Sequence, residues 1–154
     1  MLEELYREII LDHYRSPRNR GELSDADARA RGRNPVCGDD VTLYLKVCEG
    51  TITAARSTGN GCAISQASSS ILSQAVVGRS LEEALGLVAA VEGMMRGGPV
   101  PEGPQLDDLA ALEGVRKFPA RIKCALLAWE TLKEAVLEYQ QRQAGNPGVS
   151  PASA

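Results

Sequence analysis

Near both ends of the chain, apolar side chains recur at steps of three and four residues, which predicts an amphipathic helix at each place. One face of the first helix is formed by Leu2, Leu5, Tyr6, Ile9, Ile10 and His13. Pro17 removes the next backbone donor, so this helix should end near Ser16. The second helix is long, and its apolar face is formed by Leu126, Leu127, Trp129, Leu132, Val136 and Tyr139.

Between these helices the period of the pattern changes to two. Apolar residues alternate with other residues over 41–48, Glu49-Gly50 follows, and a second extended segment covers 51–58. This pattern predicts a β-hairpin with one buried face. Cys48 falls beside the turn, on the face opposite Val47, and is expected to be a bystander because free cysteine often behaves as a small apolar residue.

The segment between the hairpin and the long helix predicts three shorter helical pieces. Residues 63–72 are mostly small and form the first. The sequence Ser-Leu-Glu-Glu at 80–83 matches a capping box, which starts a second helix that runs to about residue 95. A surface loop over 97–104 then leads to a short helical piece over 106–112.

The length of 154 residues suits one domain, which we expect over residues 1–143. Residues 144–154 have nothing to bury and are expected to form a disordered tail. The net charge of −3 argues against nucleic acid as a partner, since phosphate binding calls for a basic face. The chain has neither a secretory signal nor an apolar run long enough for a membrane span, so a cytoplasmic protein is expected.

Six arginines crowd the stretch between the first helix and the first cysteine: Arg15, Arg18, Arg20, Arg29, Arg31 and Arg33. This stretch has two interpretations. It is either an ordinary solvated connection or a cationic surface that attracts an acidic partner and favours thiolate at Cys37.

Candidate chemistry lies first in the turn at 34–39, Asn-Pro-Val-Cys-Gly-Asp. Pro35 restricts the turn and Gly38 lets the backbone bend, so Cys37 and Asp39 can converge on one point. In a reducing compartment, four cysteines are more often metal-bound or reactive than paired in disulfides.

Two later cysteines also fall where helices are expected to begin. Cys62 follows two glycines and precedes the small-residue helix, so the helix N-terminus should favour its thiolate. Cys124 follows Pro119 closely, which predicts that it lies in the opening turn of the long helix or in the loop before it. Four cations precede it and either offset clustered thiolates or belong to a solvated loop: Arg116, Lys117, Arg121 and Lys123.

If these loops meet at one end of a sheet, Cys37, Asp39, Cys62 and Cys124 form a four-donor site. Three thiolates and a carboxylate suit tetrahedral zinc, and the soft donors also suit iron in a cluster. The spacing is unlike that of zinc fingers, which disfavours a purely structural site. His13 is the single histidine and is expected to be a packing residue, with a role in the chemistry as the minor alternative. A thiol hydrolase is therefore remote.

The chain resembles the IscU and NifU N-terminal family of iron–sulfur cluster assembly scaffolds, and most closely its SufU branch. The resemblance covers nearly all of residues 1–143 and rests on four motifs in the family's order, at 6–21, 34–39, 59–65 and 121–125. It implies an α+β fold of the SufE/NifU-like kind, in which helices pack on a small antiparallel three-stranded sheet with the metal site at one exposed end. It also implies that the ligands are Cys37, Cys62, Cys124 and Asp39.

The resemblance implies a zinc-binding sulfur acceptor that takes persulfide sulfur at Cys37 from a SufS-type cysteine desulfurase. Such a protein is a sulfurtransferase-like partner of that enzyme rather than a stand-alone enzyme. Its product goes to apo iron–sulfur proteins or downstream Suf assembly proteins. Lys123 stands where the IscU branch of the family has a histidine before the third cysteine. Residues 118–122 lack that branch's Leu-Pro-Pro-Val-Lys motif, which argues against a dedicated Hsp70-type chaperone.

Two alternatives use the same residues. The first is a true scaffold for a transient [2Fe–2S] cluster, with zinc as a surrogate. The second is a zinc-stabilised interaction module without sulfur chemistry.

Overall fold

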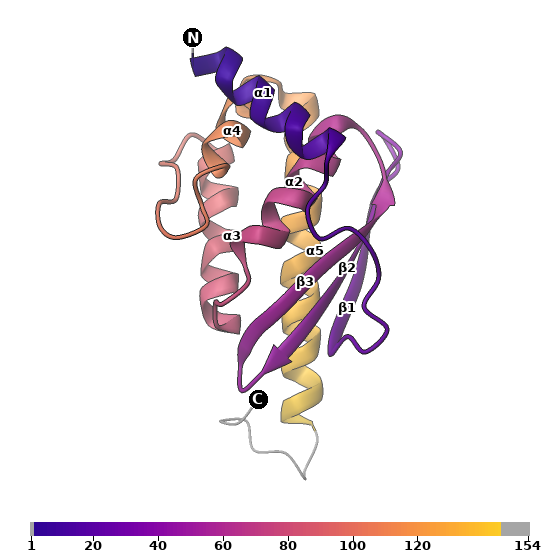
Figure 1. Cartoon of the computed structure of the whole chain (residues 1–154). Helices are drawn as coiled ribbons and strands as arrows, with labels where there is room; N and C mark the ends of the chain where they lie inside the picture. The colour runs from indigo at the N-terminus through magenta and orange to yellow at the C-terminus, as the bar shows by residue number, and fades with distance from the viewer. Residues whose placement is uncertain (1, 146–154) are drawn as a thin grey trace.

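The computed structural model describes residues 2–145 and forms a three-stranded antiparallel sheet with helices on it (Figure 1). The strands are β1 (Ala28–Asn34), β2 (Asp39–Cys48) and β3 (Thr51–Asn60), in that spatial order. The helices are α1 (Leu2–Arg15), α2 (Ala63–Ala75), α3 (Leu81–Met95), α4 (Leu109–Glu113), the 3-10 helix η1 (Gly114–Lys117) and α5 (Pro119–Ala144). The α+β fold with a three-stranded sheet is confirmed.

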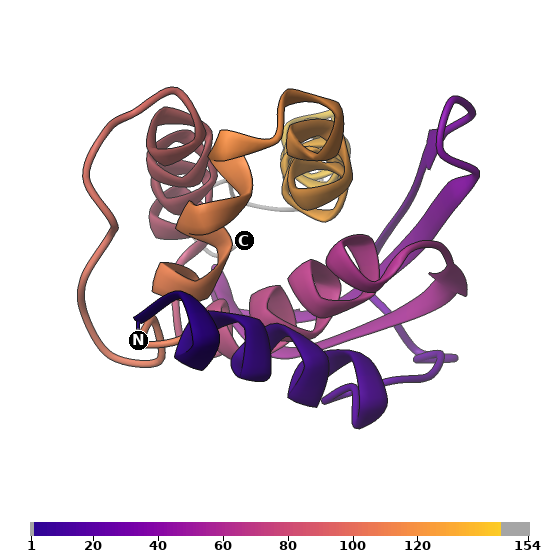
Figure 2. The ribbon, with the colours of Figure 1, turned by 90° about the horizontal axis from the view of Figure 1, so that it is seen from above.

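The long helix α5 runs beside the sheet and packs on β1 and β2, while α2 packs on β3 and on α5. Seen from above, α2 lies between α1 and α5, and α3 stands farther from the sheet (Figure 2). The apolar residues of the hairpin face these helices, because Val41, Leu43 and Leu45 are all buried. The predicted hairpin and its buried face are therefore confirmed.

The arginine-rich stretch holds a strand that the hydrophobic pattern did not reveal. In β1 the inward positions are small, Ala28, Ala30 and Gly32, and arginines occupy the outward positions between them. Small residues are required there because α5 lies close: a Cβ on Gly32 would overlap Oγ1 of Thr131. The interpretation of this whole stretch as a solvated connection was wrong for 28–34.

Small residues also bring α2 against α5. Ser68 is completely buried; its hydroxyl donates to the carbonyl of Ala125 at 2.6 Å and accepts from the indole N–H of Trp129 at 3.0 Å. The predicted capping box of α3 is present, with both bonds between Ser80 and Glu83 formed. Residues 146–154 of the predicted tail lie outside the described residues, and α5 extends to Ala144.

His13 is a buried structural residue. One ring nitrogen bonds Oγ of Ser70 on α2 at 2.7 Å, and the other bonds Oδ2 of Asp108, just before α4, also at 2.7 Å. Ser70 Oγ also accepts from the backbone N–H of Arg18 at 2.8 Å. The ring thus joins α1 to two other elements, as expected for a packing histidine. Within residues 2–145, no helix is long and apolar enough to cross a membrane.

We expect His13→Leu to lower the free energy of unfolding by about 1–3 kcal/mol, because it removes a buried ring that makes two hydrogen bonds. Urea denaturation measures this change. Arg15→Ala, on an exposed position of the same helix, is the matched control and should change stability little. Loss of metal binding by His13→Leu without loss of stability would contradict the structural assignment.

Candidate metal centre

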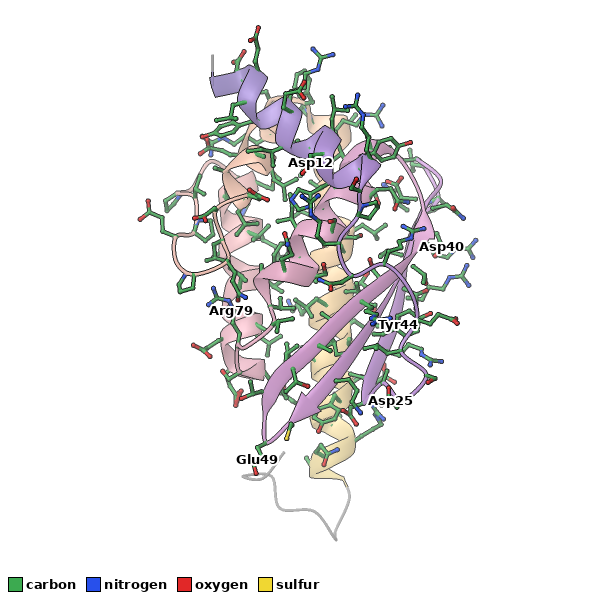
Figure 3. The ribbon with its side chains drawn as sticks, viewed as in Figure 1. Asp12, Asp25, Asp40, Tyr44, Glu49 and Arg79 are labelled. Atoms are coloured by element: carbon green, nitrogen blue, oxygen red, sulfur yellow. The ribbon has the colours of Figure 1, made fainter. Side chains whose placement is uncertain are left out.

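Four segments converge at the end of the sheet opposite the hairpin turn. Asp40 marks this end in Figure 3, and Glu49 marks the turn at the other end. Cys37 lies in the turn between β1 and β2, where Gly38 has a φ of 73° that favours glycine. Asp39 is the first residue of β2, and Cys62 follows the end of β3. Cys48 closes β2 beside Glu49 and is exposed, which places it away from this end.

Three donor atoms form a tight group: the sulfur of Cys37, a carboxylate oxygen of Asp39 and the sulfur of Cys124 all lie within 4.8 Å of one another. Asp39 and Cys124 are buried, whereas Cys37 is partly exposed. An ion bound by these donors would be held by the buried residues Asp39 and Cys124 and would be accessible from the side of Cys37.

The carboxylate of Asp39 is only half satisfied by the protein. Its Oδ1 accepts a hydrogen bond from the backbone N–H of Cys62 at 2.9 Å. Its Oδ2 is buried and has no hydrogen-bond partner among the described residues. Burying an unpaired carboxylate oxygen is costly unless a cation or a donor meets it. The orphaned oxygen beside two thiols therefore fits a bound metal ion.

Cys62 lies next to this group but outside it. It caps α2, and its sulfur accepts a hydrogen bond from the backbone N–H of Ser65 at 3.4 Å. Its predicted place at a helix N-terminus is confirmed. The structure thus brings together three of the four predicted donors, Cys37, Asp39 and Cys124. The fourth, Cys62, is held beside them by the hydrogen bond from its backbone N–H to Asp39.

Cys124 does not start its helix. Pro119 occupies the first turn of α5, so Cys124 lies in the second turn and is completely buried. Burial raises the pKa of its thiol strongly, and the neighbouring side chains of Asp39, Cys37 and Cys62 raise it further. The prediction that Cys124 lies in the opening turn of the long helix, or in the loop before it, was wrong because Pro119 already starts the helix.

Arg121, one of the four cations before Cys124, interacts with the thiols. A hydrogen bond with Cys124, followed by the charges of Cys62 and Cys124, raises the pKa of Arg121. Lys117 instead pairs with Glu3 at 2.8 Å. Arg116 donates to backbone carbonyls of Met94 and Gly98. Arg121 thus supplies counter-charge to the thiols, whereas Arg116 and Lys117 have other partners.

The chain belongs to the family of the NifU-like N terminal domain, whose model matches residues 5–146. It is 43% identical over 139 residues to the zinc-dependent sulfurtransferase SufU of Bacillus subtilis, covering 90% of this chain and 94% of that protein. It is also 43% identical to the iron-sulfur cluster assembly scaffold protein IscU of Thermotoga maritima, covering 86% and 92%.

A solved structure with the same fold is the N-terminal part of a NifU-like protein from Brucella abortus. The TM-score is 0.83 at 30% sequence identity, and the match covers 92% of this chain and 98% of that one. The family that the sequence motifs indicated is therefore confirmed, together with its fold.

Gly61 leaves the space that the Asp39 carboxylate occupies. A Cβ at residue 61 would lie 2.6 Å from Oδ1 of Asp39, so Gly61→Ala must displace the carboxylate. We expect metal affinity to fall by about 10- to 100-fold, as when a ligand loses its support. Competition with a chromophoric chelator, with Zn²⁺ as the probe ion, measures the change.

Gly86→Ala in α3 is the matched control, since a Cβ there meets nothing within 4 Å. It should leave metal affinity unchanged and raise stability by up to about 1 kcal/mol, because alanine favours a helix interior. Equal affinities of the wild-type protein and Gly61→Ala would exclude Asp39 as a ligand held in this position.

Metal binding should weaken as the pH falls. Because burial raises the pKa of Cys124, the metal-free protein keeps that thiol protonated near neutral pH, and binding must expel the proton. Affinity should therefore rise at least about tenfold per pH unit between roughly pH 6 and 8. Calorimetry in buffers of different ionisation enthalpy counts the protons released. Cys124→Ala should release one proton fewer, and equal proton release would contradict the assignment.

Proposed function

We propose that this protein is a zinc-binding sulfur acceptor and scaffold in iron–sulfur cluster assembly. It takes sulfur at Cys37 from the persulfide of a SufS-type cysteine desulfurase and passes it on to apo iron–sulfur proteins or downstream assembly proteins. It works in the cytoplasm beside that enzyme rather than as an enzyme on its own. The observation that carries the proposal is the group of Cys37, Asp39 and Cys124, in which Cys37 alone is open to a partner.

The proposed ligands are Cys37, Asp39, Cys62 and Cys124. Two of the sulfurs and the carboxylate are already grouped, and the unpartnered Asp39 Oδ2 supplies the oxygen donor. Cys62 completes the set if its sulfur turns from the Ser65 amide toward the group. Three soft sulfurs and one oxygen favour zinc over magnesium or calcium. Bound zinc keeps the thiols deprotonated and protects them from oxidation.

Sulfur transfer then follows from thiolate chemistry. The Cys37 thiolate attacks the outer sulfur of the partner's persulfide and forms a new S–S bond. The partner's S–S bond breaks, and its inner sulfur leaves as a thiolate that takes up a proton. Asp39 and Cys124 stay in place during this step because they are buried on β2 and α5, whereas Cys37 lies on a turn.

A second candidate is a true [2Fe–2S] scaffold that uses the same four residues. Its support is the set of thiolates, which also binds iron clusters, and the relatives named as scaffold proteins. Anaerobic reconstitution with iron, sulfide and a cysteine desulfurase separates the two. Formation of a cluster that absorbs visible light and is transferred to an apo-protein favours the scaffold function. Tight zinc binding together with stimulated desulfurase turnover favours the sulfur-acceptor function.

The remaining alternative is a zinc-stabilised interaction module. For such a module, chelation should unfold the protein, and its addition should leave desulfurase turnover unchanged. Stimulated turnover would exclude it.

We expect Cys37→Ala to abolish sulfur acceptance while the protein stays folded, since Cys37 is partly exposed and outside the core. Incubation with the desulfurase and cysteine, followed by mass spectrometry, detects the added sulfur as a gain of about 32 Da, the mass of one sulfur atom carried on a persulfide. The matched control is Cys48→Ala, which removes an exposed thiol at the far end of β2 and should accept sulfur normally.

Circular dichroism and thermal unfolding of the metal-free proteins show whether each variant is folded. Normal sulfur acceptance by a folded Cys37→Ala protein would remove Cys37 from this role.

A further inference from the structure

Beside the metal-binding group, the described part of the chain holds two buried side-chain atoms without a hydrogen-bond partner. They are Oδ2 of Asp39 and Nδ2 of Asn34. A cation accounts for the first. It does not account for the second, because an amide N–H is a donor and needs an acceptor. A buried donor without an acceptor is destabilising, so its acceptor is expected in the metal-bound protein.

The register of the sheet places Asn34 next to the group of metal-binding donors. It is the last residue of β1 and pairs directly with Asp39 on β2. Both side chains are on the buried face, with 8% of Asn34 and 2% of Asp39 exposed. Side chains directly opposite each other on one face of an antiparallel pair have Cβ atoms about 4.5–5.5 Å apart. The Asn34 amide therefore lies beside the carboxylate ligand.

Asn34 also belongs to the turn that carries the sulfur acceptor. Its backbone carbonyl accepts a hydrogen bond from the N–H of Cys37 at 3.2 Å. This bond closes the turn between β1 and β2 and fixes Cys37 relative to Asn34. The buried thiol of the group, Cys124, is on α5 and makes no hydrogen bond with the backbone of Asn34.

We propose that the side-chain amide of Asn34 donates a hydrogen bond to the sulfur of Cys37 in the metal-bound protein. Asn34 is then a positioning residue that orients the acceptor thiolate. Asp39 is a less suitable acceptor, because its Oδ1 already accepts from the Cys62 amide and its Oδ2 would bind the cation. The proposal rests on the proposed function, in which Cys37 is a metal ligand and takes the sulfur.

Such a bond has a definite chemical effect. A metal-bound thiolate keeps lone pairs that accept N–H donors, and donation draws electron density from the sulfur. The bond therefore stabilises the thiolate when Cys37 leaves the metal, and it holds the sulfur in the direction of the incoming persulfide. Partners of metal ligands commonly determine ligand orientation and metal affinity in this way.

The test replaces Asn34 by leucine, which has a similar shape and no donor, and uses Co²⁺ and Zn²⁺ as probe ions. In Asn34→Leu the sulfur-to-Co²⁺ charge-transfer band should move to longer wavelength, since the sulfur regains electron density. Zinc affinity should fall by about 10- to 100-fold. Asn60→Leu, at the exposed end of β3, is the matched control and should change neither.

A double-mutant cycle identifies the acceptor. In a Cys37→Ala background, Asn34→Leu should cost no further zinc affinity, because the acceptor sulfur is already gone. The same loss in both backgrounds, or an unchanged band and affinity in Asn34→Leu, would overturn the proposal. Asn34→Val serves the same test if the leucine variant does not fold.

The outcome for this inference is separate from that for the proposed function. If wild-type protein takes no sulfur at Cys37, the proposed function fails. If wild-type protein takes sulfur and Asn34→Leu behaves as wild type in both metal measurements, the role of Asn34 alone fails.

Discussion

The burial of a carboxylate at the end of the sheet is the constraint on which the rest of the site depends. Asp39 occupies an inward position of β2 where an apolar residue would otherwise extend the core. A buried carboxylate must be paired, and within residues 2–145 it receives one hydrogen bond, from the Cys62 amide. That single bond joins the start of β2 to the start of α2. The second oxygen has no partner among the described residues and is available to bind a cation.

The donors differ in how firmly the fold holds them, and this difference suits transfer chemistry. Cys124 is inside the second turn of a long buried helix, and Asp39 is in a paired strand. Cys37 is on a short turn with Val36 beside it almost fully exposed. Motion of a turn disturbs few buried contacts, whereas motion of α5 would disrupt the packing on β1 and α2. The thiol that we propose as the sulfur acceptor is therefore the one that can move.

Much of the fold followed from hydrophobic periodicity, because the hairpin and α5 bury faces of ordinary apolar side chains. The face of α1 is only partly buried: Ile9 and Ile10 are half-buried and Leu5 is exposed. The start of α3 followed from its capping box. The strand β1 gave no such signal, since alanine and glycine occupy its buried face. Small residues are required there because α5 packs closely on this strand, and α5 lies far away in the sequence. The depth of Cys124 in α5 depended on Pro119 starting the helix, which composition leaves open. The orphaned atoms of Asp39 and Asn34 depend on strand register, so a sequence pattern cannot reveal them.

The same buried polar groups connect metal binding with folding. Each unpaired polar atom at this end of the sheet costs stability in the metal-free protein, and a bound ion removes that cost for Asp39. A ligand that binds only the folded state stabilises it in proportion to its affinity. A bound ion would thus stabilise the fold at the place where we propose that sulfur is accepted. Cys37 is the least buried of the grouped donors, so its release from the ion would reduce this stabilisation least. The remaining donors would then keep the end of the sheet folded during the proposed transfer.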